Sequence, residues 1–293
     1  MPPLKVIIIG AGISGLAAAL ASRQQGHHVT LLEKSNFLRE TGAALHLGPN
    51  FSCLLKRLGM DLDAIGAVTC QGFDQYKGNG DVKMSLELTE ISKQWQYPWL
   101  LVHRVDLHRE LKRLALDTDG RGPVPELRLR CMISDIDVDA GVVKLEDGTS
   151  FSGDALIGAD GVHSISRNFI DPTAKAMPWG KSCYRWLIPM EVIHADEEMN
   201  AMAGKAGYFV EVSESDRRVI MYPCRDNSVV NFAAFLPEIE ANKSADGTYD
   251  EWCCVGTPGA DRTRLLASTR QQGAHAARLR RLLFAAEEAS CER

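Results

Sequence analysis

The sequence lacks any apolar run of the roughly 18 residues that a membrane-spanning helix requires. It also lacks an excess of positive charge, since the net charge is −5 at pH 7, which argues against broad electrostatic binding to nucleic acid or to anionic membranes. The N-terminus enters an apolar strand pattern at Lys5 and leaves no room for a signal peptide. We therefore expect a soluble cytoplasmic protein with no membrane span and no nucleic acid partner.

The eight cysteines form no CxxC pair and show no zinc-like spacing. This scatter predicts no metal site and favours reduced thiols, as in a cytosolic protein. The vicinal pair Cys253-Cys254 leaves a redox device open as an alternative. With 293 residues, the chain can bury a sizeable core in one large or two modest domains.

What the sequence does contain is a complete βαβ pattern over residues 4–34: a β-branched run, the turn GAGISG, an Ala-rich helix and a returning strand. Gly10 allows the tight turn, Gly12 lets the backbone approach a pyrophosphate, and Gly15 lets the helix pack on the sheet. Glu33 ends the second strand, where a carboxylate can accept hydrogen bonds from a ribose hydroxyl. The pattern predicts a Rossmann-like α/β domain that binds FAD or NAD rather than NADP; a glycine-rich structural turn is the alternative.

A run of small residues, Gly42-Ala43-Ala44, follows this unit. Small side chains let the backbone approach a bulky ligand, and a close helix-to-sheet contact is the alternative. Farther along, residues 100–111 predict a strand running into a helix with Asp106 as its N-cap.

The middle of the chain predicts several strands. Segments 127–131, 142–146 and 149–151 predict a small antiparallel sheet, with Asp147-Gly148 as a hairpin turn. Residues 155–158 predict a buried strand that ends just before Asp160. A carboxylate at the carboxyl edge of a parallel strand lies where α/β sheets bind ligands, although Asp160 could instead cap the following helix.

Residues 72–88 mix glycines with alternating polar and apolar residues, which predicts short strands, and longer alternating strands follow farther along the chain. Such strands suit a mainly antiparallel sheet that covers a substrate cavity. They span residues 184–190, 208–212, 218–225 and 229–236.

Four segments, GAGISGL with Glu33, LRETGAALHLGPN, HRVDLH and GADGVHSISR, resemble the class A FAD-dependent aromatic monooxygenases. The likeness is strongest to the salicylate hydroxylase-like group, which has the p-hydroxybenzoate hydroxylase fold. It implies that Ala43 and Ala44 pass beside FAD, that Arg104 contacts FAD, and that Asp160 serves both FAD and the nicotinamide reductant. Without the resemblance, Arg104 and Arg109 would be interpreted as surface ion-pair residues.

Two further positions resemble segments of fungal phenol-dearomatising members of this family. The Tyr-Arg pair that ends at Arg185 and the Met-Tyr-Pro run around Tyr222 match the segments that supply an active-site arginine and tyrosine. The resemblance implies that Arg185 holds a phenolate and that Tyr222 positions or deprotonates the phenol. An ordinary strand arginine and a core tyrosine are the alternative.

The resemblance places an FAD-binding domain at 1–70 and 100–180, interleaved with a β-sheet substrate domain at 71–99 and 181–240. It stops near residue 238, and the second FAD motif of the family, of the Gly-Asp-Ala type, is not found beyond it. Residues 241–293 are predicted to form a divergent, poorly ordered tail. Compared with the family, the chain looks C-terminally truncated.

The implied reaction is hydroxylation of a small phenolic or aromatic substrate, in fungal-type secondary metabolism or in aromatic catabolism. FAD is the cofactor, NAD(P)H the reductant and O₂ the oxidant. Two other functions remain open: a catalytically impaired or non-enzymatic flavoprotein that lacks the second FAD motif, and an FAD-dependent oxidase or dehydrogenase on the same fold.

Overall fold

The computed structural model describes residues 2–36 and 42–237. These residues divide into two compact units, made of residues 2–36, 57–60 and 105–177, and of residues 42–56, 61–104 and 178–237. The predicted tail at 241–293 and the Cys253-Cys254 pair lie outside the described residues. The predicted domain boundaries stay a prediction.

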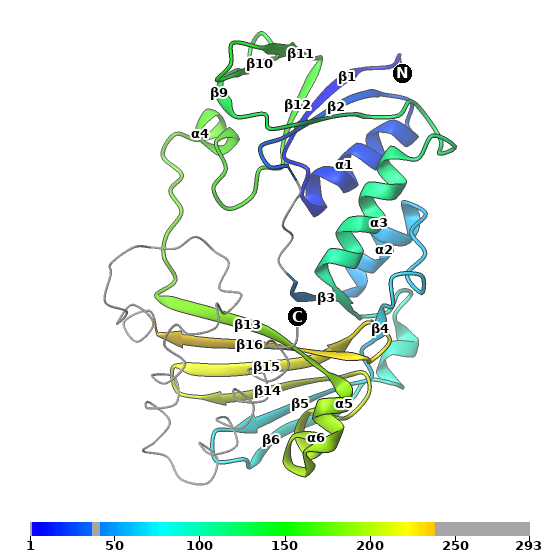
Figure 1. The fold of residues 1–293 in the computed structure, drawn as a ribbon, viewed down its shortest axis with the longest axis vertical. Helices are drawn as coiled ribbons and strands as arrows, with labels where there is room; N and C mark the ends of the chain where they lie inside the picture. Colours follow the sequence, from blue (N-terminus) through cyan, green and yellow to red (C-terminus); the bar gives the residue numbers. More distant parts are fainter. Residues whose placement is uncertain (1, 37–41, 238–293) are drawn as a thin grey trace. The chain divides into compact units, whose positions relative to one another are not determined.

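A parallel sheet of four strands, in the order β12-β1-β2-β8, forms the centre of the first unit (Figure 1). Four of the five residues of β1 are buried, as expected for a β-branched strand with a neighbour on each side. Helix α1 crosses from β1 to β2 and packs on both, which confirms the predicted βαβ unit. These elements are β1 (Lys5–Ile9), α1 (Ile13–Gln24), β2 (His28–Glu33), β8 (Glu126–Leu129) and β12 (Ala155–Gly158).

A small antiparallel sheet, in the order β11-β10-β9, belongs to the same unit. The predicted hairpin is confirmed: β10 and β11 are joined through Gly148, whose φ is +85°. The third predicted member was wrong, because the strand at 127–131 is β8, which pairs parallel with β2. The third strand of this sheet is β9 instead, which was not predicted because it contains two aspartates and aspartate is rare in strands. The strands are β9 (Ile133–Asp137), β10 (Val142–Leu145) and β11 (Ser150–Ser152).

Two further features of the first unit differ from expectation. Strand β12 exists as predicted, but it is only half-buried because it lies at the edge of the parallel sheet. Arg23, near the end of α1, is fully buried. Its guanidinium donates five hydrogen bonds to carbonyls of the segment 114–122, which contains the end of helix α3 (Arg104–Leu116) and the turn after it.

The second unit contains a six-stranded sheet in the order β13-β16-β15-β14-β5-β6, antiparallel except between β14 and β5 (Figure 1). Helices α5 and α6 lie against one face, and Asp196 caps α6 by accepting from the N–H groups of Glu198 and Met199. The elements are β5 (Gly72–Lys77), β6 (Val82–Glu87), β13 (Lys181–Pro189), α5 (Met190–Ala195), α6 (Glu197–Ala203), β14 (Tyr208–Glu214), β15 (Arg217–Cys224) and β16 (Val229–Pro237).

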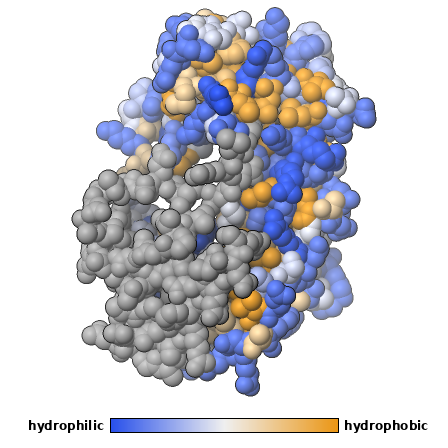
Figure 2. Space-filling model, in the orientation of Figure 1, coloured by the Kyte–Doolittle hydropathy of each residue, from blue (hydrophilic) through white to orange (hydrophobic). Residues whose placement is uncertain are grey.

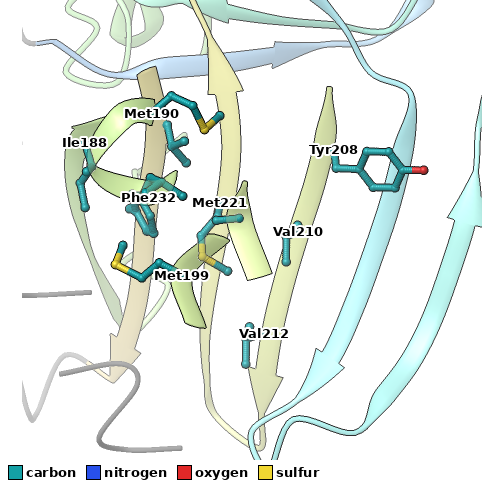
Figure 3. Packing of buried hydrophobic residues seen from close by; sticks show 11 residues of the cluster. Ile188, Met190, Met199, Tyr208, Val210, Val212, Met221 and Phe232 are labelled. Carbon is teal, nitrogen blue, oxygen red and sulfur yellow. The ribbon is translucent and has the colours of Figure 1, made fainter. Parts of the chain in front are cut away.

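The face that α5 and α6 cover holds one hydrophobic core (Figure 3). Phe232 of β16 is fully buried there and stacks on Trp186 at 5.3 Å between ring centroids. Met199 of α6 and Met221 of β15 fill the space between the helices and the sheet. This core fixes which residues of each strand face the helices, and so which residues face the other way.

A smaller antiparallel sheet, in the order β3-β7-β4, belongs to the same unit. Strand β7 runs directly into α3, which begins at Arg104. Asp106 therefore lies in the first turn of the helix, and the prediction that it is the N-cap was wrong. An acid in the first turn still interacts favourably with the helix dipole. The remaining elements are β3 (Ala44–Leu47), α2 (Pro49–Arg57), β4 (Val68–Thr69), the 3₁₀ helix η1 (Ile91–Gln94), β7 (Leu100–His103) and α4 (Ser166–Ile170), of which α4 belongs to the first unit.

No helix in the described part of the chain has both the length and the hydrophobicity needed to cross a bilayer. On the face shown in Figure 2, hydrophilic and apolar residues are mixed over the coloured surface. The predicted cytoplasmic location stays a prediction.

Candidate functional site

The glycine-rich turn between β1 and α1 has the geometry of a phosphate cradle. Gly10 has a φ of +98°, and a Cβ there would lie 2.5 Å from the carbonyl oxygen of Ala159. A Cβ on Gly15 would collide with the Gly10 carbonyl oxygen, so α1 can start this close to β1 only with glycine. At Gly12, by contrast, a Cβ would meet no atom within 4 Å. The protein itself therefore does not require a glycine at this position, whereas a ligand at the start of α1 would.

Two side chains hold this turn. The Glu33 carboxylate accepts hydrogen bonds from the N–H of Ala11 at 2.7 Å and of Ser35 at 2.8 Å, so it faces the glycine-rich turn. The buried His108 of α3 donates from Nε2 to the carbonyl of Ala11 at 2.9 Å, since a carbonyl can only accept. Each oxygen of a carboxylate has a second lone pair, so Glu33 can still accept from a ribose hydroxyl.

Asp160 follows β12 and folds the loop to α4 around its carboxylate. It accepts from the hydroxyls of Ser164 and Ser166 at 2.7 and 2.6 Å, and from the N–H groups of Ile165 and Ser166 at 2.7 and 3.0 Å. Partial burial raises the pKa of Asp160, but the hydrogen bonds from these serines outweigh it and hold the pKa below its usual value. Asp160 thus binds N–H groups at the start of α4, although Ile165 occupies the N-cap position of that helix. The predicted cofactor role of Asp160 stays a prediction.

In the second unit, the small-residue run is held by its backbone. The carbonyl of Ala43 accepts from the N–H of Arg104 at 2.7 Å, and the side chain of Arg104 is half-buried. The N–H of Ala44 donates to Oδ1 of Asn231 at 3.0 Å, while its carbonyl accepts from the hydroxyl of Tyr222 at 2.8 Å. Both groups of Ala44 are therefore bound by side chains of β15 and β16. The predicted contacts of Ala43, Ala44 and Arg104 with a cofactor stay predictions.

Arg185 and Tyr222 share one face of the six-stranded sheet. In the strand register, Asn231 pairs with both Leu187 and Tyr222, and residues two apart on a strand face the same way. Tyr222 is only 4% exposed, and burial raises its pKa well above the usual value, although the positive charge of Arg185 acts in the opposite direction. The structure therefore brings the two predicted catalytic residues together. Their catalytic roles stay a prediction.

His46 lies beside this pair and was not predicted. Its ring makes edge contacts with the rings of Trp99, Phe209 and Tyr222, at centroid distances of 5.9, 5.3 and 6.3 Å. Phe209 in turn stacks on Tyr222 at 5.2 Å. Partial burial of the imidazole, followed by the charge of Arg185, lowers the pKa of His46, so the ring is neutral at pH 7.

Two buried donors near these rings have no hydrogen-bond partner among the described residues. They are Nδ2 of the fully buried Asn231, whose Oδ1 is already engaged by Ala44, and Nε1 of Trp99. Unpaired buried donors are costly unless a bound group accepts from them. Together with the open space at Gly12, they fit a protein that binds a cofactor or substrate rich in acceptors.

Three of these residues, His46, His108 and Asn231, escaped the sequence analysis. His108 could have been found, because it lies one helical turn after Arg104 in the HRVDLH segment and so on the same side of α3. His46 follows Ala44 at strand spacing, so alternation alone could have placed both side chains on one face. No local signal marks Asn231, because its contact with Ala44 joins residues 187 positions apart.

Comparisons with known proteins agree with this geometry. The family model described as "FAD binding domain" matches residues 3–252. Hispidin-3-hydroxylase of Neonothopanus nambi is 35% identical over 258 residues, which cover 83% of this chain and 61% of that protein. The 3-hydroxybenzoate 6-hydroxylase of Polaromonas naphthalenivorans is 31% identical over 265 residues, or 86% of this chain and 63% of that protein. The chain thus spans about three fifths of the length of these relatives.

Among solved structures, HpxO of Klebsiella pneumoniae complexed with FAD and uric acid superposes with a TM-score of 0.72 at 23% identity. The match covers 98% of this chain and 66% of that one. CtdE in complex with FAD and its substrate gives a TM-score of 0.75 at 18% identity, covering 97% and 66%. At these identities the likeness shows the fold. Because the family model matches most of the chain, and the fold and glycine-rich turn agree with it, the chain belongs to the FAD-binding-domain family of class A flavin monooxygenases.

Proposed function

We propose that this protein hydroxylates a small phenolic substrate, with FAD as cofactor, NAD(P)H as reductant and O₂ as oxidant. The relatives named above are hydroxylases of hispidin and of 3-hydroxybenzoate, which are aromatic compounds. When bound, FAD supplies the redox chemistry that the side chains of a protein cannot. The protein contributes binding, orientation and control of proton movement.

The glycine-rich turn and the acid at the end of β2 are proposed to hold the adenosine end of FAD. Gly10, Gly12 and Gly15 let the pyrophosphate approach the N-terminus of α1, where unpaired N–H groups point outward. Glu33 accepts from the ribose hydroxyls, and its bond to the N–H of Ala11 fixes the carboxylate for that role. Asp160 orders the loop after β12 by accepting four hydrogen bonds, and this loop is proposed to contact both FAD and the nicotinamide reductant.

The sheet of the second unit is proposed to hold the substrate and the ring end of FAD. Ala43 and Ala44 carry only methyl groups, so their backbone can lie beside a flat ring system, and Arg104 follows β7 at the same strand pair. Arg185 offers a planar guanidinium to a phenolate oxygen. Tyr222 positions Ala44 through its hydroxyl.

One observation supports this proposal above the others: a guanidinium and a group of aromatic rings share one face of one sheet. Arg185 lowers the pKa of His46, and His46 contacts the rings of Trp99, Phe209 and Tyr222. Rings offer flat apolar surface to an aromatic substrate, and a guanidinium stabilises the negative oxygen that activates a phenol. This pairing matches the chemistry that an electron-rich aromatic ring needs for hydroxylation.

The proposal is tested with the purified 293-residue chain. We expect yellow protein, a melting midpoint that rises when FAD is added, and oxidation of NAD(P)H that accelerates when a phenol is present. Hydroxylated product should form in step with NAD(P)H consumed. Colourless protein whose melting midpoint does not change when FAD is added would contradict the proposal and favour a non-enzymatic protein. Hydrogen peroxide without hydroxylated product would favour an oxidase.

A further inference from the structure

The hydroxyl of Tyr222 is poorly suited to take a proton from a substrate. It donates to the carbonyl of Ala44 at 2.8 Å, and the side chain is only 4% exposed. A base must first lose its own proton, but ionising Tyr222 would break this bond and leave a buried negative charge. Tyr222 therefore acts as a positioning residue for β3, and the proposed reaction needs another base.

His46 stands two residues from Ala44 on the same strand, and so on the same side of it. Unlike Tyr222, it is exposed. Its ring lies edge-on to Phe209 and Trp99, at 5.3 and 5.9 Å between centroids, so the imidazole borders the aromatic surface proposed for the substrate. The position of the ring is thus fixed by neighbours, while its exposed part remains able to exchange protons with water.

The surroundings of His46 keep the imidazole in the form that can accept a proton. Strand β13 contributes the charge of Arg185, β15 contributes the protonated Tyr222, and the rings of Trp99 and Phe209 are uncharged. Positive charge and partial burial both disfavour the imidazolium. The same guanidinium favours the phenolate, so it assists removal of the proton from the substrate.

We propose that His46 is the general base that removes the phenolic proton of the substrate. This inference rests on the function proposed above and assigns a further catalytic residue to it. The O–H bond of the phenol breaks, the proton passes to a ring nitrogen of His46, and the electron pair stays on the phenolate oxygen beside Arg185. The imidazolium is repelled by Arg185 and releases its proton to water through its exposed part.

The test compares His46→Gln with the wild-type chain on two phenols of different acidity. Glutamine keeps a polar side chain but cannot take up a proton near neutral pH. With 4-methylphenol, which is protonated at pH 7, we expect kcat/KM of the variant to fall about 10²-fold, within the range for loss of a general base. With 4-nitrophenol, of which a large fraction is already ionised at this pH, the fall should be less than about tenfold, because the ionised fraction has no proton to be removed.

The pH profile and a matched variant provide further readouts. In the wild type, kcat/KM for 4-methylphenol should decrease on the acid side below the usual histidine pKa, and this limb should disappear in His46→Gln. Tyr222→Phe, which cannot ionise at all, should keep the limb. Binding can be measured without turnover by proton NMR. The imidazole signals of His46 are identified as those missing from His46→Gln, and they should shift when 4-methylphenol is added to the wild type.

The outcomes separate this inference from the proposed function. Equal losses with both phenols, or an unchanged acid limb in His46→Gln, would overturn the role of His46 while leaving a working hydroxylase. If the acid-side decrease of kcat/KM disappeared in Tyr222→Phe, Tyr222 and not His46 would be the general base. A wild-type chain that binds FAD but never responds to a phenol would overturn the proposed function, and the inference with it.

Discussion

The two units of this protein use different means to build their candidate binding groups. In the first unit, the groups lie in short contiguous motifs whose shape depends mainly on backbone geometry. Gly10, Gly12 and Gly15, for example, belong to one turn. In the second, the groups come from separate strands, and the contacts that hold Ala44 join residues 178 and 187 positions apart. A turn can be recognised from its own residues, whereas a sheet face exists only after distant strands pair.

The glycine-rich turn should be the most sensitive part of the molecule. Gly15→Val puts a branched side chain where even a Cβ collides with the Gly10 carbonyl, so we expect a loss of at least about 3 kcal/mol in unfolding free energy, or no folded protein. The matched variant Gly12→Ala meets no protein atom and should change stability by less than about 1 kcal/mol. Urea denaturation measures both.

The same pair of variants separates folding from cofactor binding. Gly12→Ala should weaken FAD binding about tenfold or more, because its methyl group occupies the space proposed for the pyrophosphate and a tenfold loss corresponds to about 1.4 kcal/mol. Flavin fluorescence titration gives the dissociation constant. Unchanged FAD affinity in a well-folded Gly12→Ala protein would show that the ligand does not approach this turn.

Arg23 tests whether the first unit also depends on contacts between distant residues. Arg23→Met keeps most of the side-chain volume but leaves five carbonyls of the segment 114–122 without their donor, so we expect a loss of about 3 kcal/mol. Arg109→Met is the control, because the side chain of Arg109 is 73% exposed and its ion pair with Asp106 is long, at 3.7 Å. Comparable unfolding midpoints for the two variants would contradict this role of Arg23.

How well each element could be predicted from the sequence depends on the same difference between the units. The βαβ unit was predicted, and its first strand begins at Lys5 as expected, because β-branched runs, glycines and an acid each carry a local signal. The long strands β13 to β16 were also predicted, since alternation marks a half-buried strand without reference to its partner. The mainly antiparallel character of that sheet is confirmed as well.

What failed was the pairing of strands and the identity of partners. Strand β8 was assigned to the small antiparallel sheet, because nothing in residues 127–131 shows that they pair with β2, about a hundred positions earlier. Asn231 was missed for the same reason, because its partner Ala44 lies on another strand. Arg185 and Tyr222 were found through resemblance, and only the strand register shows that they share a face.

Tyr222→Phe tests the contact that joins β3 to the large sheet. Removing the hydroxyl leaves the buried Ala44 carbonyl without this donor, so we expect a loss of about 1.5 kcal/mol in unfolding free energy. Tyr76→Phe is the control, because the hydroxyl of Tyr76 makes no hydrogen bond within the described residues. If both variants have the same stability, the bond to Ala44 contributes nothing to folding.

The smallest expected effect concerns Asp160 of the first unit, whose four hydrogen bonds stay within residues 160–166. Its pKa in the folded protein lies below the ordinary value of 3.8, so its carboxylate stabilises the fold above pH 3.8, and this contribution is lost as the pH falls below that value. Asp160→Asn cannot ionise and should be less stable than the wild type at pH 7 by no more than about 1 kcal/mol. Urea denaturation at pH 7 and pH 3 should show this gap narrowing in acid, because the wild-type carboxylate then takes up a proton. A gap of the same size at both pH values would mean that the contribution of the serine and backbone contacts to stability does not depend on the charge of Asp160.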